Sequence, residues 1–233
     1  MMRHSLFNTI FYTFCTMILI NLLAIPLAVF LDRNTKLKSV ERAVFFFPSI
    51  VSGLLLGYIW GYILSPMKTG ALNTLLAVFG AGPIGFTATE WGAKISIILV
   101  AVWTSTGWYA TIYLAYLQAI PNEYYEAAAI DGASRWQQFT KISLPLLKPT
   151  TVYVLTISIY AGLAMFNESY MLWKGNNSPQ NIGLTIVGYL YRQGIEKRAM
   201  GYACAVGLVL LIIVMVVNMI QLAATGTFKK EER

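Results

Sequence analysis

Five long stretches without a charged side chain constrain the fold of this chain more than any other feature. They cover residues 5–31, 43–67, 95–122, 149–167 and 199–228. Each provides about the 20 helical residues that cross the hydrocarbon layer of a bilayer. None alternates polar and apolar residues as a membrane strand must, and helices satisfy their own backbone hydrogen bonds in lipid. We therefore predict an all-α, polytopic membrane protein with five transmembrane helices in a single domain, residues 1–233.

Charged residues are scarce and lie between these stretches. Only 12% of the residues are charged, about half the share of a soluble domain, and the net charge is +7. A nucleic-acid-binding protein gathers its basic residues on a solvated face. Here the basic residues flank apolar stretches, which is typical of membrane proteins with basic cytoplasmic loops. We therefore exclude nucleic acid as a partner and expect contact with membrane lipid.

The sequence offers little for chemistry of its own. Cys15 and Cys204 lie in apolar stretches, His4 is the single histidine, and no Cys/His cluster has metal-ligand spacing. No ATP-binding loop of the form G-x-x-x-x-G-K-[ST] occurs, and the five stretches hold no paired ionisable groups. We predict a protein that is not an enzyme and has no catalytic residue, metal site or cofactor of its own.

The basic residues also predict the sidedness of the chain. Segment 32–42 is the densest basic loop, with four Lys or Arg residues, and we place it in the cytoplasm. Alternation then puts segment 124–148 and the C-terminus inside, and the connectors 66–94 and 173–198 outside. Within the first connector, the apolar patch 72–80 is expected to form a short interfacial helix.

Small residues recur at every fourth position in the second stretch, at Ser49, Gly53, Gly57 and Gly61. This spacing places a flat groove on one face of a helix, against which another helix packs closely. Two interpretations stay open, packing within this chain or contact with a second membrane subunit.

The only long, charge-bearing and helix-forming segment, YYEAAAIDGASRWQQFTKISLPLLKP, lies between the third and fourth stretches. Residues 123–130 favour a helix, which Gly132 then breaks. Ser134 and Gln137 have the spacing of a capping box, which predicts a second short helix over 135–141, ended at Leu144-Pro145. We expect two short helices at an angle, joined at Gly132, on the cytoplasmic side. By composition alone this segment is a plain connector.

The spacing within this segment is E-A-A-x₃-G-x₉-I-x-L-P, from Glu126 to Pro145. It resembles the EAA loop of inner-membrane permease subunits from binding-protein-dependent ABC importers, and every fixed position is met. The flanks are similar to the carbohydrate-uptake branch, the maltose and glycerol-3-phosphate type permeases. Three other segments are also similar to this branch: FNTIFYT, FFFPSIVSGLLLGYIWGYI and MGYACAVGLVL. The resemblance covers nearly the whole sequence.

This resemblance implies a permease subunit of a bacterial or archaeal inner membrane that moves a sugar or related solute. Its expected partners are a second, homologous permease, ABC ATPase subunits that bind the ATP, and an extracytoplasmic solute-binding protein. Loop 123–145 would dock into the ATPase, with Glu126 as a polar anchor and Gly132 as an elbow. The expected coupling residues are Glu126, Ala127, Ala128, Asp131, Gly132, Ile142, Leu144 and Pro145.

The sequence departs from the family pattern in two places. Related permeases have one more helix in front, which makes six in the family core, and this chain starts where their second would. The usual Gly-Gly-Pro after the fourth stretch is replaced by GNNSP at 175–179. Two alternatives stay open, an ABC permease for another small solute such as glycerol phosphate or an amino acid, and a channel or carrier outside the ABC class.

Polar and aromatic residues inside the stretches indicate candidates for a substrate path. A wall that stacks on a sugar needs rings and hydroxyl groups at mid-depth, although helix packing explains such residues nearly as well. Glu168, after the fourth stretch, has two interpretations, a solvated interface residue or a polar group of the path. The candidates, chosen by polarity, are Trp103, Ser105, Thr106, Tyr160 and Asn167.

Overall fold

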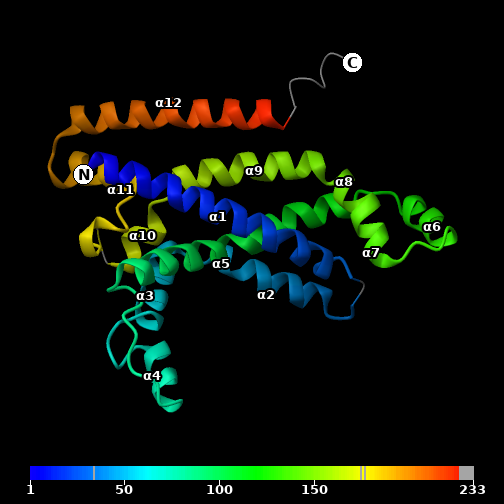
Figure 1. Ribbon diagram of the computed structural model, residues 1–233, viewed down its shortest axis with the longest axis horizontal. Helices are drawn as coiled ribbons and strands as arrows, with labels where there is room; N and C mark the ends of the chain where they lie inside the picture. Colours follow the sequence, from blue (N-terminus) through cyan, green and yellow to red (C-terminus); the bar gives the residue numbers. More distant parts are fainter. Residues whose placement is uncertain (34, 174, 176, 226–233) are drawn as a thin grey trace. The chain divides into compact units, whose positions relative to one another are not determined.

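The computed structural model describes residues 1–33, 35–173, 175 and 177–225, and the described residues form helices and turns without a strand (Figure 1). Short π-helical turns cover Phe139–Ser143 and Arg192–Glu196, and a 3₁₀ turn covers Pro179–Asn181. The α-helices in chain order are α1 (Met2–Leu31), α2 (Lys38–Ile50), α3 (Gly53–Ile63), α4 (Ala71–Val78), α5 (Glu90–Leu117), α6 (Asn122–Ile130), α7 (Arg135–Gln138), α8 (Leu144–Leu146), α9 (Lys148–Leu163), α10 (Asn167–Leu172), α11 (Ile186–Tyr191) and α12 (Met200–Ala224).

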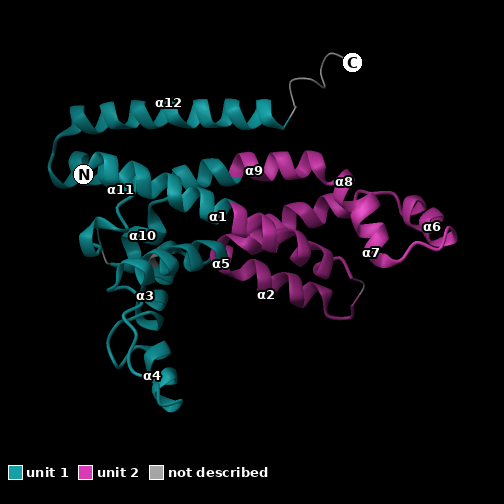
Figure 2. Ribbon diagram, viewed as in Figure 1, with its two compact units in different colours: residues 1–17, 51–103, 158–233 teal, residues 18–50, 104–157 magenta. Residues whose placement is uncertain are grey.

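These helices build two compact units (Figure 2). Unit 1 contains residues 1–17, 51–103 and 158–233, and unit 2 contains residues 18–50 and 104–157. Three helices, α1, α5 and α9, begin in one unit and end in the other. The two units are therefore interleaved along the chain.

The membrane-spanning capacity of the helices agrees with the prediction of five spans. Within the described residues, α1, α5 and α12 are each long and apolar enough to cross a bilayer. Two broken pairs, α2 with α3 and the helical segment 135–146 with α9, bring the total to five when each pair is one span. The predicted end of the last stretch, together with the charged tail that follows it, lies outside the described residues.

The single helix predicted over 43–67 is wrong. The helix stops at Ile50 and restarts at Gly53. Pro48 lacks the N–H that would bond to the preceding turn, and Ser52 adopts a non-helical backbone with φ −54° and ψ 132°. The apolar run is continuous in sequence, but its backbone is not continuously helical.

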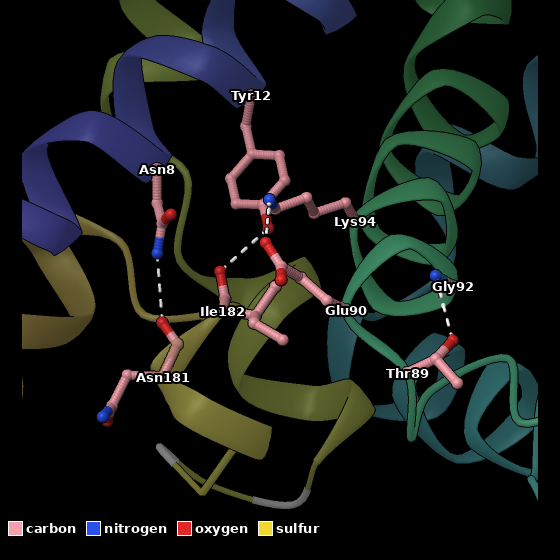
Figure 3. Close-up of polar contacts among 8 residues, drawn as sticks. All are labelled: Asn8, Tyr12, Thr89, Glu90, Gly92, Lys94, Asn181 and Ile182. Carbon is pink, nitrogen blue, oxygen red and sulfur yellow. Dashed lines mark hydrogen bonds and ion pairs between the residues drawn. The ribbon is translucent and has the colours of Figure 1, made fainter.

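Charges reach further into the third span than the sequence pattern indicated. The charge-free stretch begins at residue 95, whereas α5 begins at Glu90. The Lys94 ammonium lies 2.6 Å from a Glu90 carboxylate oxygen (Figure 3), and the Lys94 side chain is only 16% exposed. It also lies over the rings of Trp91 and Phe11, 4.9 and 5.8 Å from their centroids. A Glu–Lys pair four residues apart stabilises a helix start, so the ionic pair extends the helix.

The connector predicted over 173–198 contains short helices, and part of it packs around apolar side chains. The Thr185 hydroxyl accepts a hydrogen bond from the Gly188 N–H and caps α11. Four residues of this region and of α12 are buried together as a small core: Leu184, Ile186, Tyr189 and Val206.

The first half of α1 holds the backbone that leads into α11. Asn8 donates to the carbonyl oxygens of Asn181 and Leu184, at 3.0 and 3.2 Å. Tyr12 donates to the carbonyl oxygen of Ile182 at 2.8 Å (Figure 3). Further along, the Ile186 N–H donates to the Thr9 hydroxyl at 2.8 Å. Polar side chains of α1 thus satisfy peptide groups that are not paired within a helix.

The connector between α3 and α5 contains the expected short helix, α4. One buried side chain, Asn73, organises the turns around it. Its amide nitrogen donates to the carbonyl oxygens of Ser65, Met67 and Ile84, and its carbonyl oxygen accepts from the Ile84 N–H at 2.9 Å. Both ends of the connector are therefore held by a single amide group.

The glycine face of α3 lies against α10 within unit 1. A Cβ added at Gly57 would collide with the Cβ of Met171 and lie 3.1 Å from its Cα. The corresponding position on Gly53 lies 3.5 Å from the Asn167 Cβ, and that on Gly61 lies 3.9 Å from the Leu172 carbonyl oxygen. Packing within this chain occupies the face, and Gly57 is its closest point.

The Glu168 carboxyl, expected foremost as a solvated interface residue, is half-buried on α10. Burial raises the pKa of this carboxyl. The cause is the loss of hydration of the charged form. The carboxyl is therefore only partly hydrated, and both interpretations of Glu168 stay open.

We expect Gly57→Ala to destabilise the protein by about 1 to 3 kcal/mol, because the added methyl group must push α10 away from α3. Gly61→Ala is the matched control, since its new Cβ has room and alanine favours a helix over glycine. Thermal unfolding of the purified protein in detergent measures both. Equal melting temperatures for the two variants would contradict this packing.

We also expect Glu168 to make the protein less stable as the pH rises. The folded-state pKa is raised, so the contribution to stability is complete below the ordinary carboxyl pKa of about 4.3 and is lost as the pH rises through the raised value. Glu168→Gln should flatten this part of the pH profile of the melting temperature. The exposed Glu123→Gln is the control, and identical profiles for all three proteins would rule out a buried titrating carboxyl.

Candidate functional site

The segment predicted to couple the protein to a partner forms two helices joined at Gly132, as the sequence indicates. α6 ends in a Schellman motif, in which the Ala133 N–H donates to the Ala128 carbonyl at 2.9 Å and the Gly132 N–H to the Ala129 carbonyl at 3.1 Å. Gly132 has φ +77°, which is strained for residues with a side chain. The glycine therefore fixes the turn.

The second helix begins with the predicted capping box. The Gln137 N–H donates to the Ser134 hydroxyl at 3.3 Å, and the Ser134 N–H donates to the Gln137 side-chain oxygen at 2.7 Å. The prediction that Leu144-Pro145 ends this helix is wrong. A π turn over Phe139–Ser143 leads directly into α8, which contains Pro145. A π turn contains one more residue than an α turn, which shifts the carbonyl groups that precede the proline ring. The helical backbone therefore continues past Pro145.

The two helices are anchored to the rest of unit 2 at their ends. The hydroxyl groups of Tyr125 and Ser143 lie 2.9 Å apart and join α6 to the π turn. The helical segment 135–146 meets α9 at an angle of 62°. Ser143 and Leu147 are buried at this junction. The elbow is therefore held at its base and not only by its own turn.

The outer surface of the elbow is exposed and carries unpaired groups. No residue of α6 is buried, and Glu126 makes no hydrogen bond or ion pair with the described residues. Two large apolar side chains are also open, Ile130 at 87% and Trp136 at 71% exposure. Exposed apolar groups beside an unpaired charge are typical of a surface that binds a protein.

A hollow of about 390 Å³ lies at the inner corner of the elbow. Four of the expected coupling residues line it: Ala128, Asp131, Gly132 and Ile142. Lys141 contributes a base at its edge. The structure thus brings the start, middle and end of the spaced pattern around a single concave surface, although 14 positions separate Ala128 from Ile142 in the sequence.

The candidate path residues fall in both units. In unit 1, Trp103 is 43% exposed and its ring lies edge-on to Trp60 of α3, with centroids 5.3 Å apart. Asn167 packs near Gly53 of the same helix, and Tyr160 on α9 is 60% exposed. Unit 2 holds the other two, the half-buried Ser105 and Thr106.

Sequence reasoning missed an aromatic cluster in unit 1. The rings of Phe166, Tyr170 and Tyr191 lie 4.8 to 5.5 Å apart between centroids. Phe166 directly precedes α10 and Tyr170 lies on it, so the two flank Glu168, and Tyr191 ends α11. The alternation of aromatic and polar residues in FNESY was a local signal, but the third ring is 21 positions further along the chain.

Across the part of the chain that the structure describes, no group of three His, Cys, Asp or Glu side chains is placed to hold a metal ion. The features that stand out are a protruding, rigid elbow and a set of helices suited to a membrane.

Comparisons with known proteins agree with this description. The family of binding-protein-dependent transport system inner membrane components matches residues 7–227. The arabinooligosaccharides transport system permease protein AraP of Bacillus subtilis (strain 168) is 44% identical over 228 residues, which are 97% of this chain and 72% of that protein. The multiple sugar-binding transport system permease protein MsmF of Streptococcus mutans serotype c is 34% identical over 214 residues, 89% of this chain and 70% of that protein.

Solved structures share the fold. A chain from the crystal structure of a bacterial ABC transporter for the acidic polysaccharide alginate has a TM-score of 0.86 and 23% identity, over 95% of this chain and 78% of that one. A chain from that transporter in complex with an alginate pentasaccharide-bound periplasmic protein has a TM-score of 0.87 and 23% identity, over 97% and 79%. This chain belongs to the family of binding-protein-dependent transport system inner membrane components.

Proposed function

We propose that this protein is a permease subunit of an ABC importer that carries an oligosaccharide across the cell membrane. A second permease subunit completes the path, separate ATPase subunits supply the energy, and an extracytoplasmic binding protein delivers the solute. The protein itself performs no chemical step on the sugar.

The observation that carries the sugar assignment is the similarity to the arabinooligosaccharide permease along 97% of this chain. Other relatives are named for multiple sugars and for trehalose and maltose. The similar alginate transporter was solved with a binding protein that holds a pentasaccharide, which supports delivery by such a protein here.

The elbow at Gly132 supports docking of an ATPase. A coupling element has to transmit a movement, so it must be stiff and must present groups that pair only in the complex. The Schellman turn and the capping box provide stiffness, and Glu126 and the exposed Ile130 and Trp136 provide the binding groups. Domain closure in the ATPase would then move α9 through its junction with segment 135–146.

A neutral solute agrees with the charges of the helices. The basic side chain found well inside the start of α5, Lys94, is already paired with Glu90. Lys94 is therefore not available to bind an anionic solute. Exposed aromatic side chains such as Trp103 and Tyr160 offer faces on which a sugar ring stacks.

We expect Gly132→Val to uncouple transport from ATP hydrolysis, because a β-branched residue is strained at φ +77°. Glu126→Ala should weaken ATPase binding by about 2 kcal/mol if its charge is paired in the complex. Co-purification of the ATPase and sugar uptake into proteoliposomes measure both effects. Gly132→Asn is the matched control for the first variant, since asparagine tolerates this backbone conformation.

Both coupling variants should insert into the membrane normally, because the changed residues are exposed and no span is altered. The affinity of the binding protein for its sugar should also stay the same. Normal transport and normal ATPase recovery by Gly132→Val and Glu126→Ala together would mean that segment 123–145 is only a connector.

We expect the assembled transporter to take up neutral oligosaccharides and to leave glycerol phosphate outside. Proteoliposomes that contain the complex and its binding protein would be tested with a panel of neutral sugars, glycerol phosphate and an amino acid mixture. ATP hydrolysis that the loaded binding protein stimulates distinguishes an ABC importer from a channel or carrier. Uptake of glycerol phosphate alone would contradict the sugar assignment.

A further inference from the structure

A groove of about 310 Å³ runs between α2 and α5 inside unit 2. Arg42, Ala43 and Phe46 line it from α2. At one end Phe46 stacks on Trp108, with ring centroids 6.0 Å apart. The two helices touch beside this pair, because a Cβ added at Gly107 would collide with the backbone of α2. The groove therefore closes at its aromatic end.

The α5 wall of the groove is largely apolar. It consists of Thr111, Leu114 and Ala115, which share one face of α5 by their spacing, and of Gln118 just after the end of the helix. From Thr111 to Gln118 the wall rises by about 10 Å. Leu114 and Ala115 thus give this wall an aliphatic surface between its two polar residues.

The other end of the groove is polar and basic. Arg42 donates to the Leu31 carbonyl at 3.4 Å, and Gln118 donates to the Asp32 carboxylate at 3.3 Å, so both lie beside the end of α1. The Arg42 Nε is buried and has no hydrogen-bond partner, and the guanidinium forms no ion pair among the described residues. Since no carboxylate pairs with it among the described residues, the guanidinium charge is available to an anion.

The charge around this end favours an anion. Segment 32–42 contains four basic and two acidic residues. The acids already have hydrogen-bond partners, since Glu41 accepts from the Thr35 hydroxyl at 3.1 Å and Asp32 from Gln118. The Arg33 guanidinium lies over the ring of Phe30, 5.5 Å from its centroid. Positive charge is therefore in excess where the groove opens.

We propose that this groove binds one anionic phospholipid, with an acyl chain along α5 and the phosphate at Arg42. An amphiphile matches both parts of the groove, the apolar wall and the basic mouth. A helix of another subunit would fill the groove but would leave the arginine without an anion. A free phosphate would engage Arg42 but would leave the apolar wall open. Basic pockets between membrane helices bind anionic head groups in the same way.

The test uses the assembled transporter in detergent, exposed to phosphatidylglycerol and phosphatidylcholine with identical acyl chains. Native mass spectrometry counts the lipids that stay bound. The wild type should retain one phosphatidylglycerol in preference to phosphatidylcholine. Arg42→Gln should reduce that preference about fivefold, the effect of one base near an anionic head group. Arg42→Lys should keep part of it, and Lys68→Gln, in the connector between α3 and α5, should leave it unchanged.

A second variant fills the groove without changing charge. Ala115→Trp should lower retention of both lipids, whereas Tyr116→Trp, on the neighbouring position and outside the groove, should not. Glycerol phosphate added in excess should fail to displace the lipid, because it lacks an acyl chain. Unchanged lipid retention in both Arg42→Gln and Ala115→Trp overturns the proposal. So does loss of a protein subunit from Ala115→Trp with the lipid still bound, which would make the groove a subunit interface.

Discussion

The constraint on which this structure depends is that peptide groups within a membrane protein need partners wherever the helix is broken. An unpaired N–H or C=O in an apolar environment costs several kcal/mol. The first half of α1 meets this need for residues 181–186 through Asn8, Thr9 and Tyr12. Asn73 does the same for the connector between α3 and α5. The polar residues of these helices are therefore structural first, which explains why they lie within apolar stretches.

At the elbow, the peptide groups at the helix break also find hydrogen-bond partners. The Schellman turn at Gly132 and the capping box at Ser134 satisfy the ends of two helices that no other element covers. Because these ends are satisfied locally, the elbow keeps its shape without a partner, and its exposed side chains stay available for one. A preformed surface of this kind binds without the cost of ordering a flexible loop. This is the physical basis on which docking of an ATPase is proposed.

Charges divide into those that are paired and those that are not. Lys94 and Glu90 neutralise each other at the start of α5. Glu126, on the elbow, and Arg42, at the mouth of the groove, have no ionic partner among the described residues. A protein and a lipid are the two occupants that we propose for them.

The sequence by itself determined those structural features that depend on residues close together along the chain. Apolar length predicted the five spans, and turn chemistry predicted α6, the elbow at Gly132 and the start of α7, because these follow from residues within one or two turns. The tertiary structure decided the rest. Contacts between distant segments fold α11 within an expected connector, seat α10 on Gly57, partly bury Glu168 and leave a groove between α2 and α5. Each depends on which side chains meet across helices, and periodicity along one segment does not contain that information.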